Sequence, residues 1–287
     1  MLPDVQRMSP EAKFKLTRVG VRGIKKPLVI QRPQKSVNLI GTIDAFVDLP
    51  AERKGSDMSR SVEIVSEIVD LSTRKQYRGI EYLAEDIVDK LLKKHDYANY
   101  AEVRICTDYF LERTRPSGKK SIEKYSLFAL ASKRRGEKGK KMIGVEVIAM
   151  MVCPCAMENT RSIYYKSFPK NIPVISHNQR GVITIMMDVI DGYEVDADEL
   201  IEIAEESASS PTYEILKRQE EAEVVWRAHN NPKFVEDVVR DILKRLLEKY
   251  PDMPDECRVV VGCESEESIH KHNAFAERIT TFGELRE

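Results

Sequence analysis

The 287-residue sequence has little of several residue types that mark particular classes of protein. It has one Trp and five Cys, and an odd cysteine count in a chain of this length argues against a disulfide framework. It lacks an excess of either charge, with 46 Lys and Arg against 47 Asp and Glu, which argues against a nucleic-acid partner. It also lacks long apolar runs and an apolar segment in residues 1–18, so we expect no membrane partner, no signal peptide and a cytoplasmic location.

Hydrophobic periodicity divides the chain into alternating groups of strands and helices. Apolar alternation predicts strands at residues 18–31, 37–49, 102–114, 121–132, 142–152, 181–190, 257–263 and 274–282. Helical spacing and cap residues predict helices from 59 or 61 to about 72, at 80–94, from 196 with a capping box of Asp196 and Glu199, and from Asn231-Pro232. The N-terminal residues 1–17 are polar, and we expect an arm that orders late or on a partner subunit.

The order strand-strand-helix-helix-strand-strand occurs twice, without sequence similarity between the halves. This order predicts an α+β protein with two antiparallel β-sheets, each backed by two α-helices. We place the first domain at residues 1–141 with its N-terminal arm and the second at residues 142–287. The second face of each sheet needs cover, and burial in an oligomer is the simplest way to provide it.

Residues 153–180 combine side chains that bind transition metals. Cys153-Pro154-Cys155 directly follows an apolar predicted strand, and residues 176–180 read Ser-His-Asn-Gln-Arg. Because Pro154 lacks a backbone N–H and fixes φ, the chain should leave the sheet at this tripeptide. Cys thiolate and His imidazole are ligands that zinc and ferrous iron accept. Cys is also a common small buried residue, so a purely structural role for these thiols stays open.

The sequence contains only five His, and their positions differ in what they indicate. His95 ends a predicted helix and His229 lies at the start of another, so both are expected to be structural. His270 and His272 precede a predicted strand and would share one face of an extended segment, with Glu267 close by. Such a group suits metal binding or proton transfer.

Six sequence blocks, in chain order, resemble the metal-dependent GTP cyclohydrolases of the tunnelling-fold class. They lie at residues 48–61, 153–156, 176–181, 216–218, 228–241 and 267–277. The resemblance runs from about residue 17 to residue 277. It is greatest for the archaeal ferrous-iron enzymes of methanopterin biosynthesis, which are related to the bacterial type IB enzymes. It implies two tunnelling-fold domains per chain, GTP as substrate, and a homodimer or homotetramer with sites where the sheets of subunits meet.

The resemblance also implies roles for individual residues. The metal ligands that it assigns are Cys153, His177 and His270. The catalytic residues that it assigns are Cys153, Glu267 and His272, with Cys155 in a supporting role. Candidate ligands of the triphosphate are Lys54, Arg60 and Arg180. One Fe²⁺ per subunit is expected, with Zn²⁺ or Mn²⁺ as substitutes, and His272 is the candidate proton donor to the departing ring nitrogen.

The sequence departs from the family pattern at three positions. Asp57 stands where members usually carry His, while the metal-site Glu aligns with Pro211 and the purine-anchoring Glu with Trp226. The nearest acids that would replace these glutamates are Glu206, Glu214 and Glu223.

Three interpretations follow from the sequence. The first is an archaeal-type enzyme that releases formate and diphosphate from GTP and gives 7,8-dihydroneopterin 2',3'-cyclic phosphate. The second keeps the tunnelling fold with the bacterial product, 7,8-dihydroneopterin triphosphate, or with another purine or pterin as substrate. The third is a structural metal protein in which Cys153, Cys155 and His177 fold the segment between them.

Overall fold

A computed structural model describes residues 4–32, 36–72, 75–167, 169 and 171–287. The chain forms two compact units. The first comprises Met1–Asp108, Leu127–Ile143 and Asp188–Ile190, and the second comprises Tyr109–Ser126, Gly144–Met187 and Asp191–Glu287. The units alternate along the chain because four strands contribute residues to both. The predicted domain boundary between residues 141 and 142 stays a prediction.

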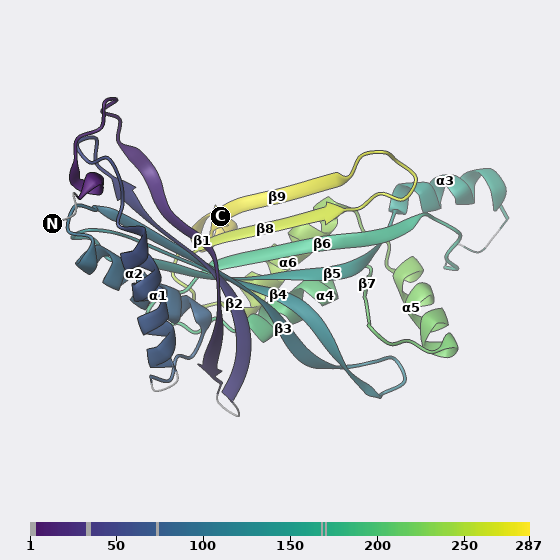
Figure 1. Cartoon of the computed structure of the whole chain (residues 1–287). Helices are drawn as coiled ribbons and strands as arrows, with labels where there is room; N and C mark the ends of the chain where they lie inside the picture. Colours follow the sequence, from purple (N-terminus) through teal and green to yellow (C-terminus); the bar gives the residue numbers. More distant parts are fainter. Residues whose placement is uncertain (1–3, 33–35, 73–74, 168, 170) are drawn as a thin grey trace. The chain divides into compact units, whose positions relative to one another are not determined.

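The fold is α+β, as predicted, and the strands of the two predicted sheets are hydrogen-bonded into one large antiparallel sheet (Figure 1). Their hydrogen-bonded order is β1-β2-β3-β4-β5-β6-β8-β9, with β7 paired to β5. Their bounds are β1 Leu16–Gln31, β2 Ser36–Leu49, β3 Tyr100–Thr114, β4 Lys120–Arg134, β5 Lys140–Val152, β6 Asn178–Asp188, β7 Ser210–Pro211, β8 Arg258–Ser265 and β9 Ala274–Thr281. Each predicted strand is therefore present, with ends within a few residues of those expected.

Seven α-helices accompany the strands in the described part of the chain. Their bounds are α1 Met58–Ser72, α2 Ile80–Lys94, α3 Pro154–Tyr164, α4 Ala197–Ser207, α5 Arg218–Asn230, α6 Val235–Lys249 and α7 Phe282–Arg286, and a short 3-10 turn, η1, covers Val5–Arg7. Among the described residues, no helix has both the length and the apolar character needed to span a bilayer.

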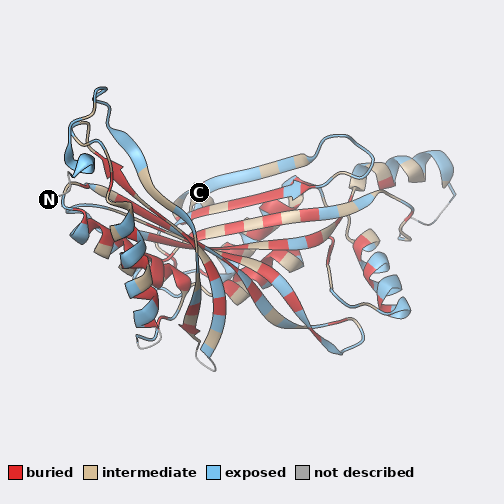
Figure 2. Cartoon of the chain, in the orientation of Figure 1, coloured by how far each residue is buried: buried red, intermediate tan, exposed pale blue. Residues whose placement is uncertain are grey.

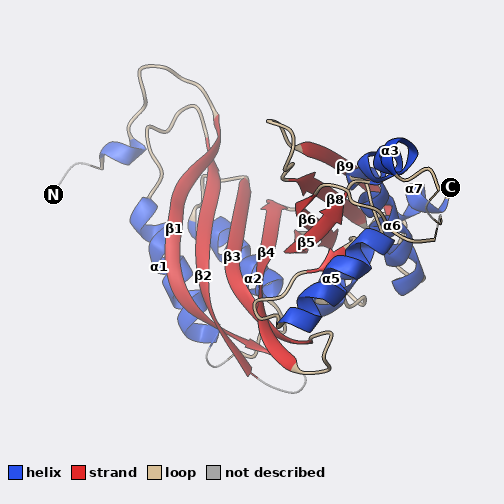
Figure 3. Ribbon diagram, turned by 90° about the vertical axis from the view of Figure 1, so that its right-hand side faces the viewer, coloured by secondary structure: helices blue, strands red, loops and turns tan. Residues whose placement is uncertain are grey.

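In the first unit, α1 and α2 lie on the same face of strands β1 and β2 (Figure 3). The alternation in β2 explains this arrangement, because Leu39, Ile43 and Val47 are buried while Ile40 on the other face is 73% exposed. Figure 2 shows the same alternation of buried and exposed residues along the strands. One face of this part of the sheet is therefore core, as the period-2 pattern predicts.

In the second unit, α4 and α6 pack against each other, and α6 packs on β8 and β9. The apolar stripe of α6 is buried, with Val238, Ile242 and Leu246 fully inaccessible to solvent. The Asp196 side chain caps α4 by accepting the Asp198 N–H at 2.8 Å, as expected from the sequence. Glu199 does not complete the capping box, because its carboxylate accepts the hydroxyl of Tyr250 at 2.8 Å.

Several sequence predictions are wrong between the sheet elements. No helix was predicted between Cys153 and His177 or just before Asn231, but these segments contain helices α3 and α5. Asn231 caps the C-terminus of α5, and α6 begins only at Val235, so His229 lies in the last turn of a helix and not at a helix start. Residues 168 and 170 of the Cys/His segment and residues 1–3 of the arm lie outside the described residues.

The N-terminal arm contacts its own chain. Lys54 N–H donates to Met8 O at 2.9 Å, Gly55 N–H donates to Gln6 O at 3.1 Å, and the Gln6 amide donates to Ser56 O at 3.0 Å. The arm therefore fastens the loop that follows β2.

Candidate functional site

A pocket of about 450 Å³ lies in the second unit, where the ends of β5, β6 and β8 meet the start of α6. Its lining includes five of the nine predicted site residues, which are Cys153, His177, Glu267, His270 and His272. They come from three separate segments of the sequence, and the antiparallel pairing of β6 with β8 helps to bring these segments together. We call this cavity the Cys153 pocket.

Cys153 directly follows β5 and is the N-cap residue of α3. Its Sγ accepts the Ala156 N–H at 3.4 Å, and Pro154 occupies the first turn, where its missing N–H leaves no unsatisfied donor. The backbone N–H of Cys153 donates to His177 O at 3.2 Å, and Ser176 Oγ donates to Cys153 O at 2.7 Å. The two predicted ligands are thus fixed to each other through their backbones.

A hydrogen-bond network orients the His177 ring. Gln179 Nε2 donates to Ser265 Oγ at 2.9 Å and to Glu267 Oε1 at 3.1 Å, which leaves the Gln179 amide oxygen facing His177 Nδ1 at 3.0 Å. Nδ1 therefore carries the hydrogen of the neutral ring, and Nε2 carries the lone pair that can accept a metal or a proton. Glu267 Oε2 lies 3.5 Å from the same Nδ1.

Glu267 also has a buried oxygen that is not satisfied. Its side chain is 10% exposed, and Oε2 has no hydrogen-bond partner among the residues that the structure describes. A buried carboxylate oxygen without a donor is costly. The pocket therefore favours a cation or an N–H group of a ligand at this point.

His270 and His272 lie in the loop between β8 and β9. Their rings are stacked with centroids 5.2 Å apart and an interplanar angle of 14°. The His270 ring meets the His177 ring edge-on, with centroids 6.2 Å apart. Both loop histidines are exposed, so their rings are open to protons and to ligands entering the pocket.

The donor set has the chemistry of a transition-metal site but is not complete in this single chain. Thiolate, imidazole and carboxylate together suit zinc or ferrous iron. Within the described residues, however, no group of three or more His, Cys, Asp or Glu side chains lies close enough together to hold an ion. The residues therefore fit a metal by type, while a compact three-donor arrangement would need a movement or a further donor.

The other predicted residues do not line this pocket. Cys155 is exposed on α3, and its Sγ accepts a hydrogen bond from Asn159 Nδ2 at 3.6 Å. Arg180 is exposed, and its backbone oxygen accepts the Glu266 N–H at 2.9 Å. Lys54 and Arg60 belong to the first unit.

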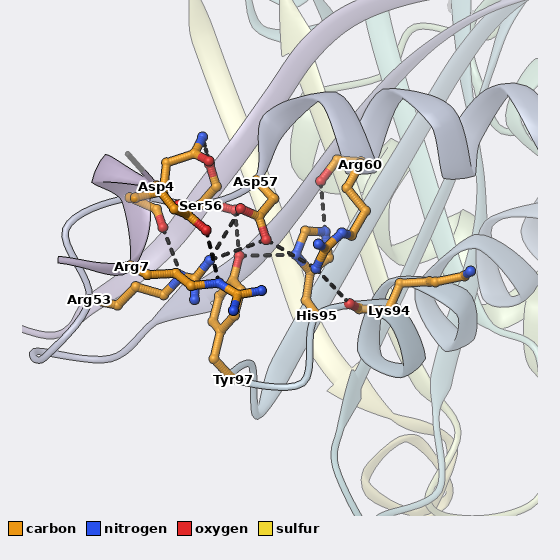
Figure 4. Close-up of polar contacts among 12 residues, drawn as sticks. Asp4, Arg7, Arg53, Ser56, Asp57, Arg60, Lys94, His95 and Tyr97 are labelled. Carbon is orange, nitrogen blue, oxygen red and sulfur yellow. Dashed lines mark hydrogen bonds and ion pairs between the residues drawn. The ribbon is translucent and has the colours of Figure 1, made fainter. Parts of the chain in front are cut away.

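Figure 4 shows that Arg60 is part of a polar cluster around Asp57. The Asp57 carboxylate lies 3.0 Å from Arg60 Nη1 and 3.1 Å from Arg53 Nη2. Arg60 also donates to Lys94 O at 3.1 Å, and the Arg53 guanidinium lies 4.1 Å from the centre of the Tyr97 ring. The charge of Arg60, predicted to meet a phosphate, is thus already compensated within the chain.

His95 is the buried centre of the same cluster. It is 0% exposed, and its ring nitrogens lie 3.0 Å from the Tyr97 hydroxyl and 3.1 Å from Ser61 Oγ. Burial, helped by the positive charge of Arg60 and opposed by Asp57, lowers the pKa of His95. The structural role expected for this residue is confirmed.

Sequence reasoning missed several residues of the Cys153 pocket. The additional polar or aromatic lining residues are Gln179, Lys233, Phe234, Glu236, Ser265 and Phe275. Lys233, Phe234 and Glu236 fall in a block that carried the family resemblance, but no chemistry was assigned to them. The acids considered for the missing family glutamates do not line the pocket, because Glu206 pairs with Arg245 and Glu223 faces a different cavity.

The fold places the chain among the tunnelling-fold proteins. A uricase from Arthrobacter globiformis superposes with a TM-score of 0.57 at 8% identity, covering 92% of this chain and 93% of its own. A urate oxidase from Bacillus sp. TB-90 gives a TM-score of 0.51 at 12% identity, covering 93% of this chain and all of its own. At such low identity, these likenesses establish the fold alone.

The sequence identifies the family more narrowly. The family described as type I GTP cyclohydrolase folE2 matches residues 2–276, and the chain belongs to it. The chain is 43% identical over 303 residues to a protein named GTP cyclohydrolase MptA from Methanosphaera stadtmanae, covering 99% of this chain and 97% of that one. It is 41% identical to a protein of the same name from Methanococcus aeolicus, covering 100% and 99%.

Proposed function

We propose that this protein is a metal-dependent GTP cyclohydrolase, which opens the imidazole ring of GTP at C8 and releases formate. The observation that carries the proposal is the Cys153 pocket, where thiol, imidazole and carboxylate side chains meet in a chain whose full-length relatives are named GTP cyclohydrolases. Ring opening requires hydroxide to attack C8 of GTP, which is a weak electrophile. A metal ion can supply this hydroxide, and the thiol, imidazole and carboxylate donors suit such an ion.

Cys153, His177 and His270 would hold the divalent cation, which we propose to be Fe²⁺. When bound, the cation supplies a Lewis acid that makes hydroxide available near neutral pH. The incomplete donor set of the single chain is consistent with a site that is finished by a second subunit or by closure of the loop between β8 and β9.

The chain's own residues would position the ligands and move protons. Glu267 and Gln179 hold the His177 ring in the tautomer that presents Nε2 to the pocket. His272 is exposed at the pocket edge and is suited to protonate the departing ring nitrogen and to take a proton back later. Glu267 Oε2 is buried and has no donor among the described residues, so it would accept a hydrogen bond from the substrate or attract the cation.

We assign the triphosphate to Lys54, Arg60 and Arg180. All three carry charge suited to phosphate, but Arg60 first has to exchange its ion pair with Asp57. We propose diphosphate and 7,8-dihydroneopterin 2',3'-cyclic phosphate as the products, because the similar proteins quoted above are archaeal and named MptA. The reaction would begin pterin biosynthesis.

A substrate panel tests the proposal. The protein is reconstituted with Fe²⁺ without oxygen and incubated with GTP, GDP, ATP or 7,8-dihydroneopterin, while formate release and the pterin product are measured. We expect formate from GTP and a cyclic phosphate product. Formate from another purine but not from GTP would contradict the proposed substrate, and a triphosphate product would contradict the proposed product.

A further inference from the structure

A second cavity, of about 200 Å³, lies in the second unit and shares none of its described lining residues with the Cys153 pocket. The end of β3 and the following turn contribute Thr114 and Arg115 to its wall. Tyr213, from the segment after β7, and Arg227, from α5, contribute further polar groups. We call it the Arg115 cavity.

Arg115 brings a buried and unsatisfied donor to this cavity. Its side chain is 9% exposed, and its Nη1 donates to Glu220 Oε2 at 3.2 Å and to Ile215 O at 3.3 Å. Its Nε is buried and has no hydrogen-bond partner in the part of the chain that the structure describes. Because a buried charged group rarely leaves a donor unused, this N–H points to an acceptor supplied by a ligand.

Glu220 is not available as that acceptor. Its carboxylate already takes hydrogen bonds from Ser117 Oγ, from the Lys217 N–H at 2.8 Å and from Arg115 Nη1. The pKa of Glu220 is lowered, mainly by the Ser117 hydrogen bond and then by the Lys217 N–H and the charge of Arg115. The Glu220 carboxylate therefore stays ionised and compensates the charge of Arg115. Among the described residues, the Nε–H nevertheless has no acceptor.

Arg227 and Tyr213, from two other segments of the chain, also line the cavity with side chains that can donate hydrogen bonds. Arg227 is an exposed residue of α5 and contributes a second guanidinium to the wall. Burial raises the pKa of Tyr213, so its hydroxyl remains a neutral donor near neutral pH. Glu223, one helical turn before Arg227, is the acid of this wall and limits how much negative charge the cavity tolerates.

We propose that the Arg115 cavity binds a small phosphate-type oxyanion, held by Arg115 Nε–H, Arg227 and the Tyr213 hydroxyl. The three donor residues come from a turn, a post-strand segment and a helix around one cavity. A tetrahedral group with several oxygens can accept from three donors, whereas a planar carboxylate offers two oxygens. The oxyanion is inorganic phosphate or the phosphate of a small monoester. This site is separate from the residues assigned above to the triphosphate of GTP.

Calorimetric titration with inorganic phosphate tests the proposal on the whole protein. The wild type should bind phosphate more tightly than acetate at matched ionic strength. Arg227→Gln should weaken phosphate binding roughly tenfold, the loss of about one charge-assisted hydrogen bond. Arg240→Gln, which removes an exposed charge on α6 away from the cavity, is the matched control and should bind like the wild type.

Two further measurements keep the test independent of any effect on folding. Glu223→Gln removes the acid from the wall and should tighten phosphate binding, which mere loss of structure would not do. Titration with glycerol 3-phosphate decides whether the phosphate is free or esterified, and binding of either one supports the proposal. The proposal is overturned if neither phosphate binds, if acetate binds as tightly, or if Arg240→Gln weakens binding as much as Arg227→Gln.

Discussion

At the scale of single residues, Cys153 and His177 are joined through their backbones, so either side chain can be changed without removing that link. We predict that Cys153→Ser and His177→Ala each lower bound metal and formate release by at least about 10–100-fold, a loss typical even for residues that only support a ligand. Metal analysis and formate assays check this, with circular dichroism to confirm folding.

Cys155→Ser is the comparison for this pair. Cys155 is exposed and lies outside the Cys153 pocket, so its replacement should have a much smaller effect on bound metal. Full metal occupancy in Cys153→Ser or His177→Ala would show that the residue is not a ligand. Unfolding on chelation of the wild type would instead favour the structural metal protein.

The thiol of Cys153 also bears on the identity of the metal. Zinc binds thiolate and imidazole more tightly than ferrous iron does, so affinity alone does not select iron. We predict weak activity after aerobic purification, recovery on anaerobic addition of Fe²⁺, and renewed loss in air through oxidation of the iron or the thiols. Equal and air-stable activity with Zn²⁺ or Mn²⁺ would refute the ferrous assignment.

His95 gives the first unit a predictable pH dependence. Its folded-state pKa lies below the ordinary value of 6.5, mainly because of burial, so the unfolded chain takes up the proton first as the pH falls. The free energy of unfolding is therefore unaffected by this group above the ordinary pKa of 6.5, and it falls as the pH drops below that value. In urea unfolding, the free energy of unfolding should fall less between about pH 7.5 and about pH 5.5 for His95→Gln than for the wild type. Equal drops would exclude His95 as the cause.

At the scale of elements, the N-terminus of α5 is fastened to the turn between β3 and β4. Glu220 in the first turn of α5 accepts from Ser117 and Arg115 of that turn, which lie more than a hundred residues earlier in the chain. We predict that Glu220→Ala lowers the thermal midpoint, because it leaves the buried Arg115 charge without a counter-ion. The exposed neighbour Glu221→Ala should have little effect. Equal midpoints would show that this contact does not hold α5.

At the scale of the whole molecule, several large apolar residues of the strands are more than half exposed. The most exposed of these on the strands are Ile40, Phe110, Ile122, Phe275 and Ile279. Single exposed apolar residues are ordinary, but a series along one sheet favours association. We predict an oligomer of at least two chains at micromolar concentration. Sedimentation that shows a monodisperse monomer would end this proposal.

Local sequence patterns determined most of the sheet and its main helices. Helix α2 occupies residues 80–94 as predicted, because its apolar residues recur at helical spacing and are buried in one core. The strands were equally predictable, since alternation along β2 or β4 reflects burial on one face only. The tandem pattern and the family resemblance then pointed to the tunnelling fold and to the residues of the Cys153 pocket.

The tertiary structure decided what no local pattern carries. Helices α3 and α5 were missed because they bury few residues, only Met157 in α3, so their apolar signal is weak. The Asp57 partner of Arg60, the buried Nε of Arg115 and the unsatisfied oxygen of Glu267 were likewise not predictable. Each of these features depends on which side chains, distant in the sequence, become neighbours in the folded chain. The free energies of burial and of charge compensation depend on neighbours in space, so only the packing of the whole chain determines them.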